Sequence, residues 1–227
     1  VRAFILCNPQ NPTGRVFTRE ELTQLAEICI RHNVLIISDE IHCDILYDDR
    51  KHIPIASLSP EVAANTITFM APSKTYNIAG LHASVYIVQN PGLKEKLQTF
   101  CNGLIGNPGV LSLTAALAAY AEGDEWLAEQ NRYLQANRDF LDGALRTHLT
   151  GIHWSKPEAT FLGWLDCSEL GLAEPPYEFF LREARVGLND GITFGPQYGD
   201  FVRINFGTTR ANLQKAIDRM QAALAAR

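Results

Sequence analysis

The sequence lacks the features by which several broad classes of protein are recognised. No apolar run approaches the roughly 20 residues that a membrane-spanning helix needs. The 20 Lys and Arg residues are scattered along the chain and are outnumbered by 25 Asp and Glu residues, which gives a formal net charge of −5. A surface that binds nucleic acid or an anionic membrane would require a basic stripe. We therefore expect neither nucleic acid nor a membrane as a partner.

Paired metal-binding or disulfide-forming residues are also missing. The cysteines are odd in number, none belongs to a CxxC pair, and the six histidines include no HExxH pair. This pattern predicts neither a disulfide framework nor a zinc site. Unpaired thiols favour a reducing compartment, so we expect a cytoplasmic protein without a metal. The five cysteines are Cys7, Cys29, Cys43, Cys101 and Cys167.

The chain has enough apolar residues to build a sizeable core. Its 227 residues are 46% hydrophobic and 20% charged, which is typical of a globular protein with one large domain or somewhat more. It opens on Val1 and enters a buried-strand pattern, "VRAFILC", at once. Because domains rarely begin inside a core strand, we expect the protein to continue upstream of Val1.

Strands and helices alternate over the first third of the chain. The apolar run at 3–7 ends in the loop "NPQNPTG", and a helix follows whose start has the capping-box spacing of Thr18 and Glu21. "VLIIS" (34–38) and "TITFM" (66–70) are two further buried strands. This alternation predicts the α/β class, with a parallel sheet and right-handed crossovers.

The later part of the chain has a different pattern. "ASVYIVQ" (83–89) follows the third strand after too few residues for a parallel crossover, which predicts an antiparallel edge strand. A long amphipathic helix and then short strands indicate a smaller C-terminal α+β domain. The domains expected are a large domain over 1–124, a connecting helix over 125–150 and the small domain over 151–227.

Three polar residues follow three successive strands. Asn11, Asp39 and Lys74 each come shortly after the carboxyl end of a predicted parallel strand, where ligands of α/β proteins bind. We therefore expect them to meet at one rim of the sheet. Two other interpretations stay open at this point, because the amine and the carboxylate could form a simple ion pair, and an Asn between prolines is often only a turn residue.

Four ordered motifs carry a resemblance to a known family. "NPQNPTG", "SDEIH", "SKTYNIAGL" and "FVRINFG" resemble those of the fold-type I pyridoxal-phosphate (PLP) enzymes of the aminotransferase class I/II family. The combination of "DEIH" with "SKTYNIAG" and a later "PEATFLGWLD" is most similar to the MalY/PatB-like cystathionine β-lyase (C–S lyase) subgroup. The resemblance covers nearly the whole chain, but only the later part of the family's length. It implies the PLP-dependent transferase-like fold and PLP as cofactor.

The resemblance also implies roles for individual residues. Lys74 is the catalytic lysine that holds the cofactor covalently and then acts as a general base. Asp39 pairs with the pyridinium nitrogen of PLP, and Asn11 donates to its phenolate oxygen. His42 stands where many relatives have a tyrosine that contacts the same oxygen, although a partly solvated loop histidine is an equally simple interpretation. Arg203 binds the α-carboxylate of the substrate through a bidentate fork.

Two positions depart from the family pattern around the cofactor phosphate. His82 stands where many relatives have an arginine, and Ala71 stands where a serine is common. Ser73 is the remaining hydroxyl donor nearby, and we expect it to contact the cofactor. The family builds the rest of its phosphate site from a segment upstream of the first motif.

The expected function is a PLP-dependent C–S β-lyase that releases a thiol, pyruvate and ammonia from a small sulfur-containing amino acid. A transaminase with the same residues around the cofactor is the alternative among enzymes. A regulatory PLP-binding protein, or an inactive fragment, is the alternative outside them. We expect a homodimer in which a second copy covers the exposed apolar face of the sheet.

Overall fold

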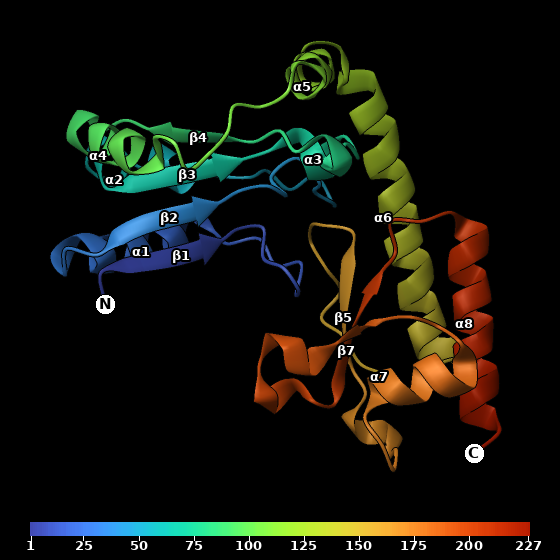
Figure 1. The fold of residues 1–227 in the computed structure, drawn as a ribbon. Coiled ribbons are helices and arrows are strands. Elements are labelled where there is room, and N and C mark those ends of the chain that lie inside the picture. Colours follow the sequence, from blue (N-terminus) through green and yellow to red (C-terminus); the bar gives the residue numbers. More distant parts are fainter. The chain divides into compact units, whose positions relative to one another are not determined.

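The computed structural model describes residues 1–227, which divide into two compact units (Figure 1). The first unit contains Val1–Gln10 and Arg15–Glu129, and the second contains Asn11–Gly14 and Gln130–Arg227. None of the helices combines the length and the apolar composition that crossing a membrane requires.

The first unit is built on a four-stranded sheet in the order β1-β2-β3-β4. The strands β1 (Ala3–Cys7), β2 (Leu35–Asp39) and β3 (Thr66–Met70) are parallel. The edge strand β4 (Val85–Val88) pairs with β3 in the antiparallel direction. The α/β class, the parallel sheet and the antiparallel edge strand are therefore confirmed.

Helices α1 (Arg19–Arg31) and α2 (Pro60–Ala64) pack on one face of this sheet, together with the short turn η1 (Ile55–Ser57). The predicted capping box starts α1, because Thr18 Oγ1 accepts from the Glu21 amide and Glu21 accepts from the Thr18 amide. The buried core between these elements consists of Leu6, Leu22, Ala26, Cys29, Ile36, Ile55 and Val62.

Four further helical segments complete the first unit before α6 begins. They are the single turn α3 (Pro72–Thr75), the 3₁₀ turn η2 (Ala79–Leu81), α4 (Pro91–Cys101) and α5 (Val110–Glu122). Helix α5 has no buried residue, and it exposes Val110, Leu111, Leu113 and Leu117.

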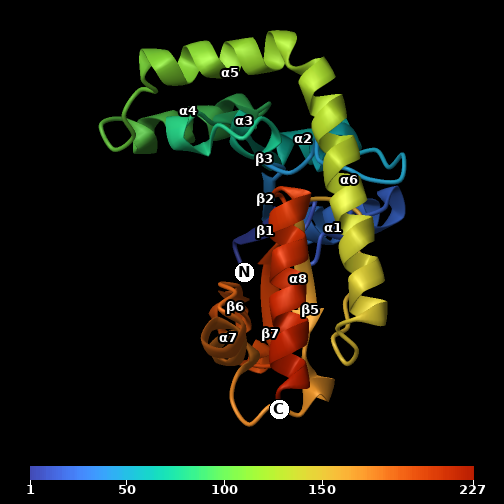
Figure 2. The same ribbon diagram turned by 90° about the vertical axis from the view of Figure 1, so that its right-hand side faces the viewer.

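The second unit has a three-stranded antiparallel sheet in the order β5-β7-β6. Its strands are β5 (Leu162–Asp166), β6 (Asn189–Asp190) and β7 (Phe201–Asn205), of which the two-residue β6 was not predicted. Figures 1 and 2 show the unit's part of α6 (Asp124–Thr147) beside α8 (Arg210–Ala225) on one face of this sheet. The short segments are η3 (Ser168–Leu170), α7 (Pro176–Phe179), the π turn η4 (Phe180–Ala184), η5 (Gly191–Phe194) and η6 (Pro196–Tyr198).

A fully buried asparagine joins α6 to the segment between β7 and α8. Asn137 Nδ2 donates to the carbonyl oxygens of Phe206 (3.0 Å) and Thr208 (2.8 Å). Its Oδ1 accepts from Arg210 Nε at 2.9 Å. All the hydrogen-bonding groups of the amide are thus used, which a buried polar side chain requires.

Asn137→Ala should lower the free energy of unfolding by about 2 kcal/mol, because it leaves two carbonyl oxygens and a guanidinium without their partner. Urea unfolding followed by circular dichroism measures the change. Gln221→Ala, at an exposed position of α8, is the control and should be close to neutral. Equal stability of the Asn137 variant and the parent protein would contradict this account of the link.

Candidate functional site

The carboxyl ends of β2 and β3 bring Asp39 and Lys74 into the same part of the first unit. β2 and β3 are adjacent and parallel, and Asp39 pairs in register with Phe69. Asp39 is the last residue of β2, whereas Lys74 lies in the helical turn that follows β3. A carboxylate and an amine therefore follow neighbouring strand ends, where α/β proteins bind their ligands.

Lys74 is half-buried and makes no hydrogen bond or ion pair with the rest of the chain. The simple ion pair with Asp39 that the sequence left open is thus not formed. The neighbouring Ser73 is also half-buried, and its hydroxyl makes no hydrogen bond within the chain. An amine and a hydroxyl thus stand side by side with their polar atoms available to a ligand.

Asp39 and His42 lie in and just after the end of β2. Asp39 Oδ1 accepts from the Ile41 amide at 3.2 Å, and its backbone oxygen accepts from the Asn8 amide at 3.0 Å. The first contact holds the carboxylate and leaves its Oδ2 available, and the second holds the backbone at the end of β2. His42 is only 3% exposed, so the interpretation as a partly solvated loop histidine is wrong.

A cluster of weak acids surrounds Asp44, two residues after His42. Burial, with the Asp44 carboxylate as the next cause, raises the pKa of the Cys43 thiol above its ordinary value. The same two causes raise the pKa of Tyr76 and bring that of Tyr120 to about 12. These three groups are therefore protonated at neutral pH, and a negative charge at Asp44 is the main electrostatic feature among them.

Asn11 and Arg203 meet in the second unit. Arg203 Nη1 donates to Asn11 Oδ1 at 2.7 Å, while Nε and Nη2 donate to Asn189 Oδ1 at 3.3 and 3.0 Å. The guanidinium also lies 5.0 Å from the centre of the Phe194 ring, in cation–π geometry. Burial lowers its pKa from the ordinary value, and it forms no ion pair with any carboxylate of the chain.

The position of Asn11 relative to Asp39 and Lys74 stays a prediction, because Asn11 belongs to the second unit and they belong to the first. Asn11 Oδ1 is engaged by Arg203, so the donor end of its amide, Nδ2, is the end suited to an acceptor oxygen.

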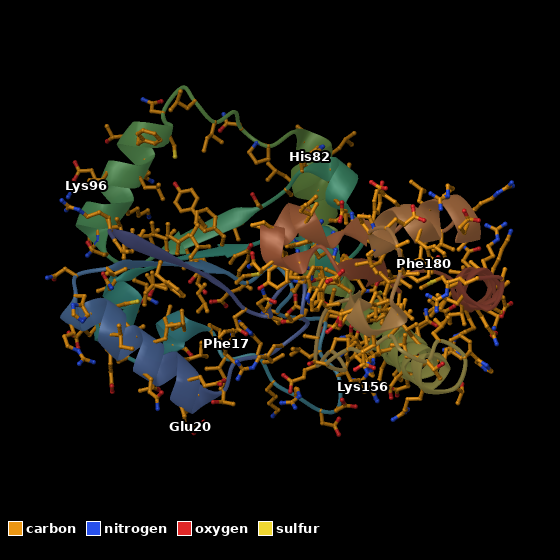
Figure 3. The ribbon with its side chains drawn as sticks, turned by 90° about the horizontal axis from the view of Figure 1, so that it is seen from below. Phe17, Glu20, His82, Lys96, Lys156 and Phe180 are labelled. Atoms are coloured by element: carbon orange, nitrogen blue, oxygen red, sulfur yellow. The ribbon has the colours of Figure 1, made fainter.

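The two departures from the family pattern lie on either side of Lys74. Ala71 is buried at the end of β3 and offers no hydroxyl. His82, labelled in Figure 3, is exposed and follows η2 with a left-handed backbone, φ 52°. Ser73 therefore remains the hydroxyl donor of this segment.

Sequence reasoning missed two polar groups that hold the candidate residues. Asn189 faces Arg203 directly in the β6–β7 pairing, and its strand was too short to be predicted. Glu40, next to Asp39, is 1% exposed and accepts from Ser38 Oγ at 2.8 Å. Its other oxygen lies 2.7 Å from His52 Nε2. The acidic pair in "SDEIH" was a signal for Glu40, because a charged residue directly after a buried strand needs a partner.

Comparison with known proteins identifies the family of the chain. A model of the family described as aminotransferase class I and II matches residues 1–220. The chain belongs to this family. Cystathionine β-lyase PatB of Bacillus subtilis (strain 168) is 41% identical over 99% of the chain and 58% of PatB.

Solved structures of this family have the same fold. The PLP-bound C–S lyase of Staphylococcus hominis superposes with a TM-score of 0.92 at 37% identity, over 99% of the chain and 59% of that structure. Cystalysin of Treponema denticola, which contains a PLP cofactor, superposes with a TM-score of 0.95 at 29% identity, over 99% of the chain and 58% of that structure. The fold-type I assignment is therefore confirmed. The chain spans somewhat under three fifths of the length of these relatives.

The residues present fit PLP, the cofactor of this aminotransferase family. Lys74 offers a half-buried amine without a partner in the chain, which is what covalent attachment of an aldehyde requires. Asp39 has one carboxylate oxygen, Oδ2, without a hydrogen bond in the chain, which is the chemistry that a protonated ring nitrogen requires. The Ser73 hydroxyl, which makes no hydrogen bond within the chain, is a donor of the kind that a phosphate group requires.

The raised pKa of buried thiols predicts a loss of stability in alkali. Below pH 9.0, the ordinary thiol pKa, Cys43 is protonated in both the folded and the unfolded state. Its contribution to the free energy of unfolding is then fully present. Above pH 9.0 the unfolded chain releases this proton while the folded chain keeps it, so the folded state loses up to about 1.4 kcal/mol per pH unit for each such group. Cys167, whose pKa is raised to about 12 by burial, adds to the effect.

Urea unfolding at pH 8 and pH 10 measures this loss. The free energy of unfolding should decrease from pH 8 to pH 10. The decrease should be smaller for Cys43→Ala than for the parent protein. An equal fall in both proteins would contradict the assignment to Cys43.

Proposed function

We propose that this protein is a PLP-dependent C–S β-lyase that converts a sulfur-substituted cysteine and water to a thiol, pyruvate and ammonia. One observation carries the proposal: Lys74, a half-buried amine with no partner in the chain, follows the strand next to the one that ends in Asp39. The relatives named cystathionine β-lyase and C–S lyase support the choice of reaction.

We propose that six residues bind the cofactor or the substrate. Lys74 holds PLP covalently, and Asp39 accepts a hydrogen bond from the ring nitrogen. His42 and Asn11 form hydrogen bonds to the phenolate oxygen, and the Ser73 hydroxyl donates to the phosphate. Arg203 binds the substrate rather than the cofactor.

When bound, PLP accepts the electron pair that remains when the Cα–H bond of an amino acid is broken. The chain's own groups handle the protons. Lys74 would hold the cofactor covalently, and its free Nζ would take the proton from Cα of the bound substrate. The Asp39 carboxylate keeps the ring nitrogen protonated, since a nearby negative charge favours the cationic form. The Cβ–S bond would then break with its electron pair on sulfur, and the proton that Lys74 Nζ took from Cα would pass to the leaving thiolate. Water would hydrolyse the remaining three-carbon unit to pyruvate and ammonia.

Arg203 is suited to a substrate carboxylate because it is a partly buried cation without a carboxylate partner of its own. Its three donor nitrogens are held by Asn11 and Asn189, which fixes the plane of the guanidinium. A preorganised fork loses less freedom when a ligand binds than a free side chain does.

Transamination is the second candidate, supported by the family's description. It would use the same residues and would return the proton to the cofactor instead of expelling a thiol. One assay distinguishes the two reactions: the protein is given cystathionine with and without a keto acid. Thiol and pyruvate release without the keto acid supports the lyase, whereas amino transfer that requires the keto acid supports the transaminase.

We further infer a homodimer, supported by the apolar side chains that α5 exposes along its length. Analytical ultracentrifugation of the protein measures the mass of the assembly. The cytoplasmic location remains a prediction from cysteine usage. A purely regulatory PLP-binding protein would bind the cofactor in the same assays but release no thiol or keto acid.

Lys74→Ala should abolish covalent PLP labelling and lower turnover by about 1,000-fold or more, because it removes both the attachment point and the base. The fold should persist, since the lysine makes no contact on which packing depends. Borohydride trapping followed by mass spectrometry, together with thiol release, measures both effects. Lys96→Ala in α4 is the matched control. Near-normal turnover of the Lys74 variant would refute the proposed role.

Asn189→Ala should raise KM for the amino-acid substrate by about tenfold while changing kcat less, because Arg203 loses two of its three hydrogen bonds. Steady-state kinetics on cystathionine measures the change. Asn205→Ala, an exposed asparagine on β7 that bonds only to the local Gly207 amide, is the control. A KM equal to that of the parent would show that Asn189 does not position Arg203.

A further inference from the structure

The residue directly after Lys74 makes a buried hydrogen bond to a distant part of the chain. Thr75 is fully buried, and its Oγ1 donates to Asp44 Oδ2 at 2.9 Å. Asp44 lies 31 positions earlier in the sequence, in the turn that begins at the end of β2 with Asp39. The bond therefore links the segment after β2 to the segment after β3.

The segment that carries Asp44 is itself firmly held. The Glu40 amide donates to the Phe69 oxygen of β3 at 2.9 Å, and the buried Glu40 carboxylate is bonded to Ser38 and His52. Asp44 is thus presented from an anchored turn rather than from a mobile surface loop.

The segment that carries Lys74 has little support of its own. Helix α3 is one turn of four residues, and it ends with the Tyr76 amide donating to the Pro72 oxygen at 2.9 Å. A single turn is unstable in isolation, because it fixes several backbone dihedrals for very few hydrogen bonds. A tertiary contact is needed to hold it, and the Thr75 hydroxyl provides one from inside the turn.

We propose that Asp44 and Thr75 are positioning residues that fix the turn carrying Lys74, and so hold its amine at the carboxyl end of β3. The bond joins a neutral hydroxyl to a carboxylate, which is the stronger, charge-assisted kind. This inference rests on the proposed function, because it assigns the Lys74 amine to covalent attachment of PLP.

The test compares how fast Lys74 of the full chain acquires a borohydride-trapped PLP label. Thr75→Val keeps the shape of the side chain but removes the donor, and labelling should slow about tenfold or more. Thr75→Ser restores the hydroxyl and should label within about twofold of the parent. Amide hydrogen exchange at Tyr76, measured without PLP, should be faster by a similar factor in Thr75→Val but not in Thr75→Ser.

Thr66→Val is the matched control. Thr66 is a buried threonine at the opposite end of β3, and its Oγ1 donates to the Val62 oxygen at 2.7 Å. This variant loses a buried hydroxyl bond as Thr75→Val does, so its thermal stability should fall comparably. Its labelling rate and its Tyr76 exchange should match those of the parent, which separates positioning from general stability.

Asp44→Ala removes the acceptor instead of the donor and should slow labelling as Thr75→Val does. The double variant should be no slower than the slower single one, because both changes remove the same bond. A parent-like labelling rate in either folded single variant would overturn the positioning role. Absence of any label in the unsubstituted protein would instead overturn the proposed function itself.

Discussion

The parallel pairing of β2 with β3 is the constraint on which the candidate site depends. It sets Asp39 opposite Phe69, and it is extended one residue further by the bond from the Glu40 amide to the Phe69 oxygen. Parallel strands deliver their carboxyl ends to one edge, so whatever follows each strand must emerge there. A shift of one residue would turn Asp39 to the other face of the sheet.

Buried, hydrogen-bonded polar groups near this edge of the sheet support the candidate site. Ser38, Glu40 and His52 are bonded in the buried layer, and Asp44 reaches from the same turn to Thr75. Each of these groups would be costly to bury alone and is acceptable only because it is paired. The pairing leaves the Lys74 amine and the Ser73 hydroxyl, which have no partner in the chain, available to a ligand at this edge.

In the second unit, Arg203 is likewise held in place by polar partners. Two asparagine oxygens and an aromatic ring hold the guanidinium without neutralising it. A carboxylate in place of Asn189 would neutralise the charge of the guanidinium. Amides orient a cation and leave its charge available, which suits a binding group better than an ion pair does.

The sequence by itself determined the α/β class, the three parallel strands, the antiparallel edge strand and the capping box of α1. These features follow from local patterns: apolar runs of strand length, the length of the crossovers and a side chain three residues from its cap. The ends of the predicted strands also singled out Asn11, Asp39 and Lys74, whereas Arg203 was identified through the resemblance of its motif to a known family.

Only the tertiary structure decided which neighbours these residues have. The two-residue strand β6 has no periodicity to detect, so Asn189 became visible only through its pairing with Arg203. The bond between Asp44 and Thr75 spans 31 residues, and the burial of His42 depends on the packing of its whole turn. Contacts of this kind are made by the fold rather than by adjacent residues, and no local pattern of the sequence encodes them.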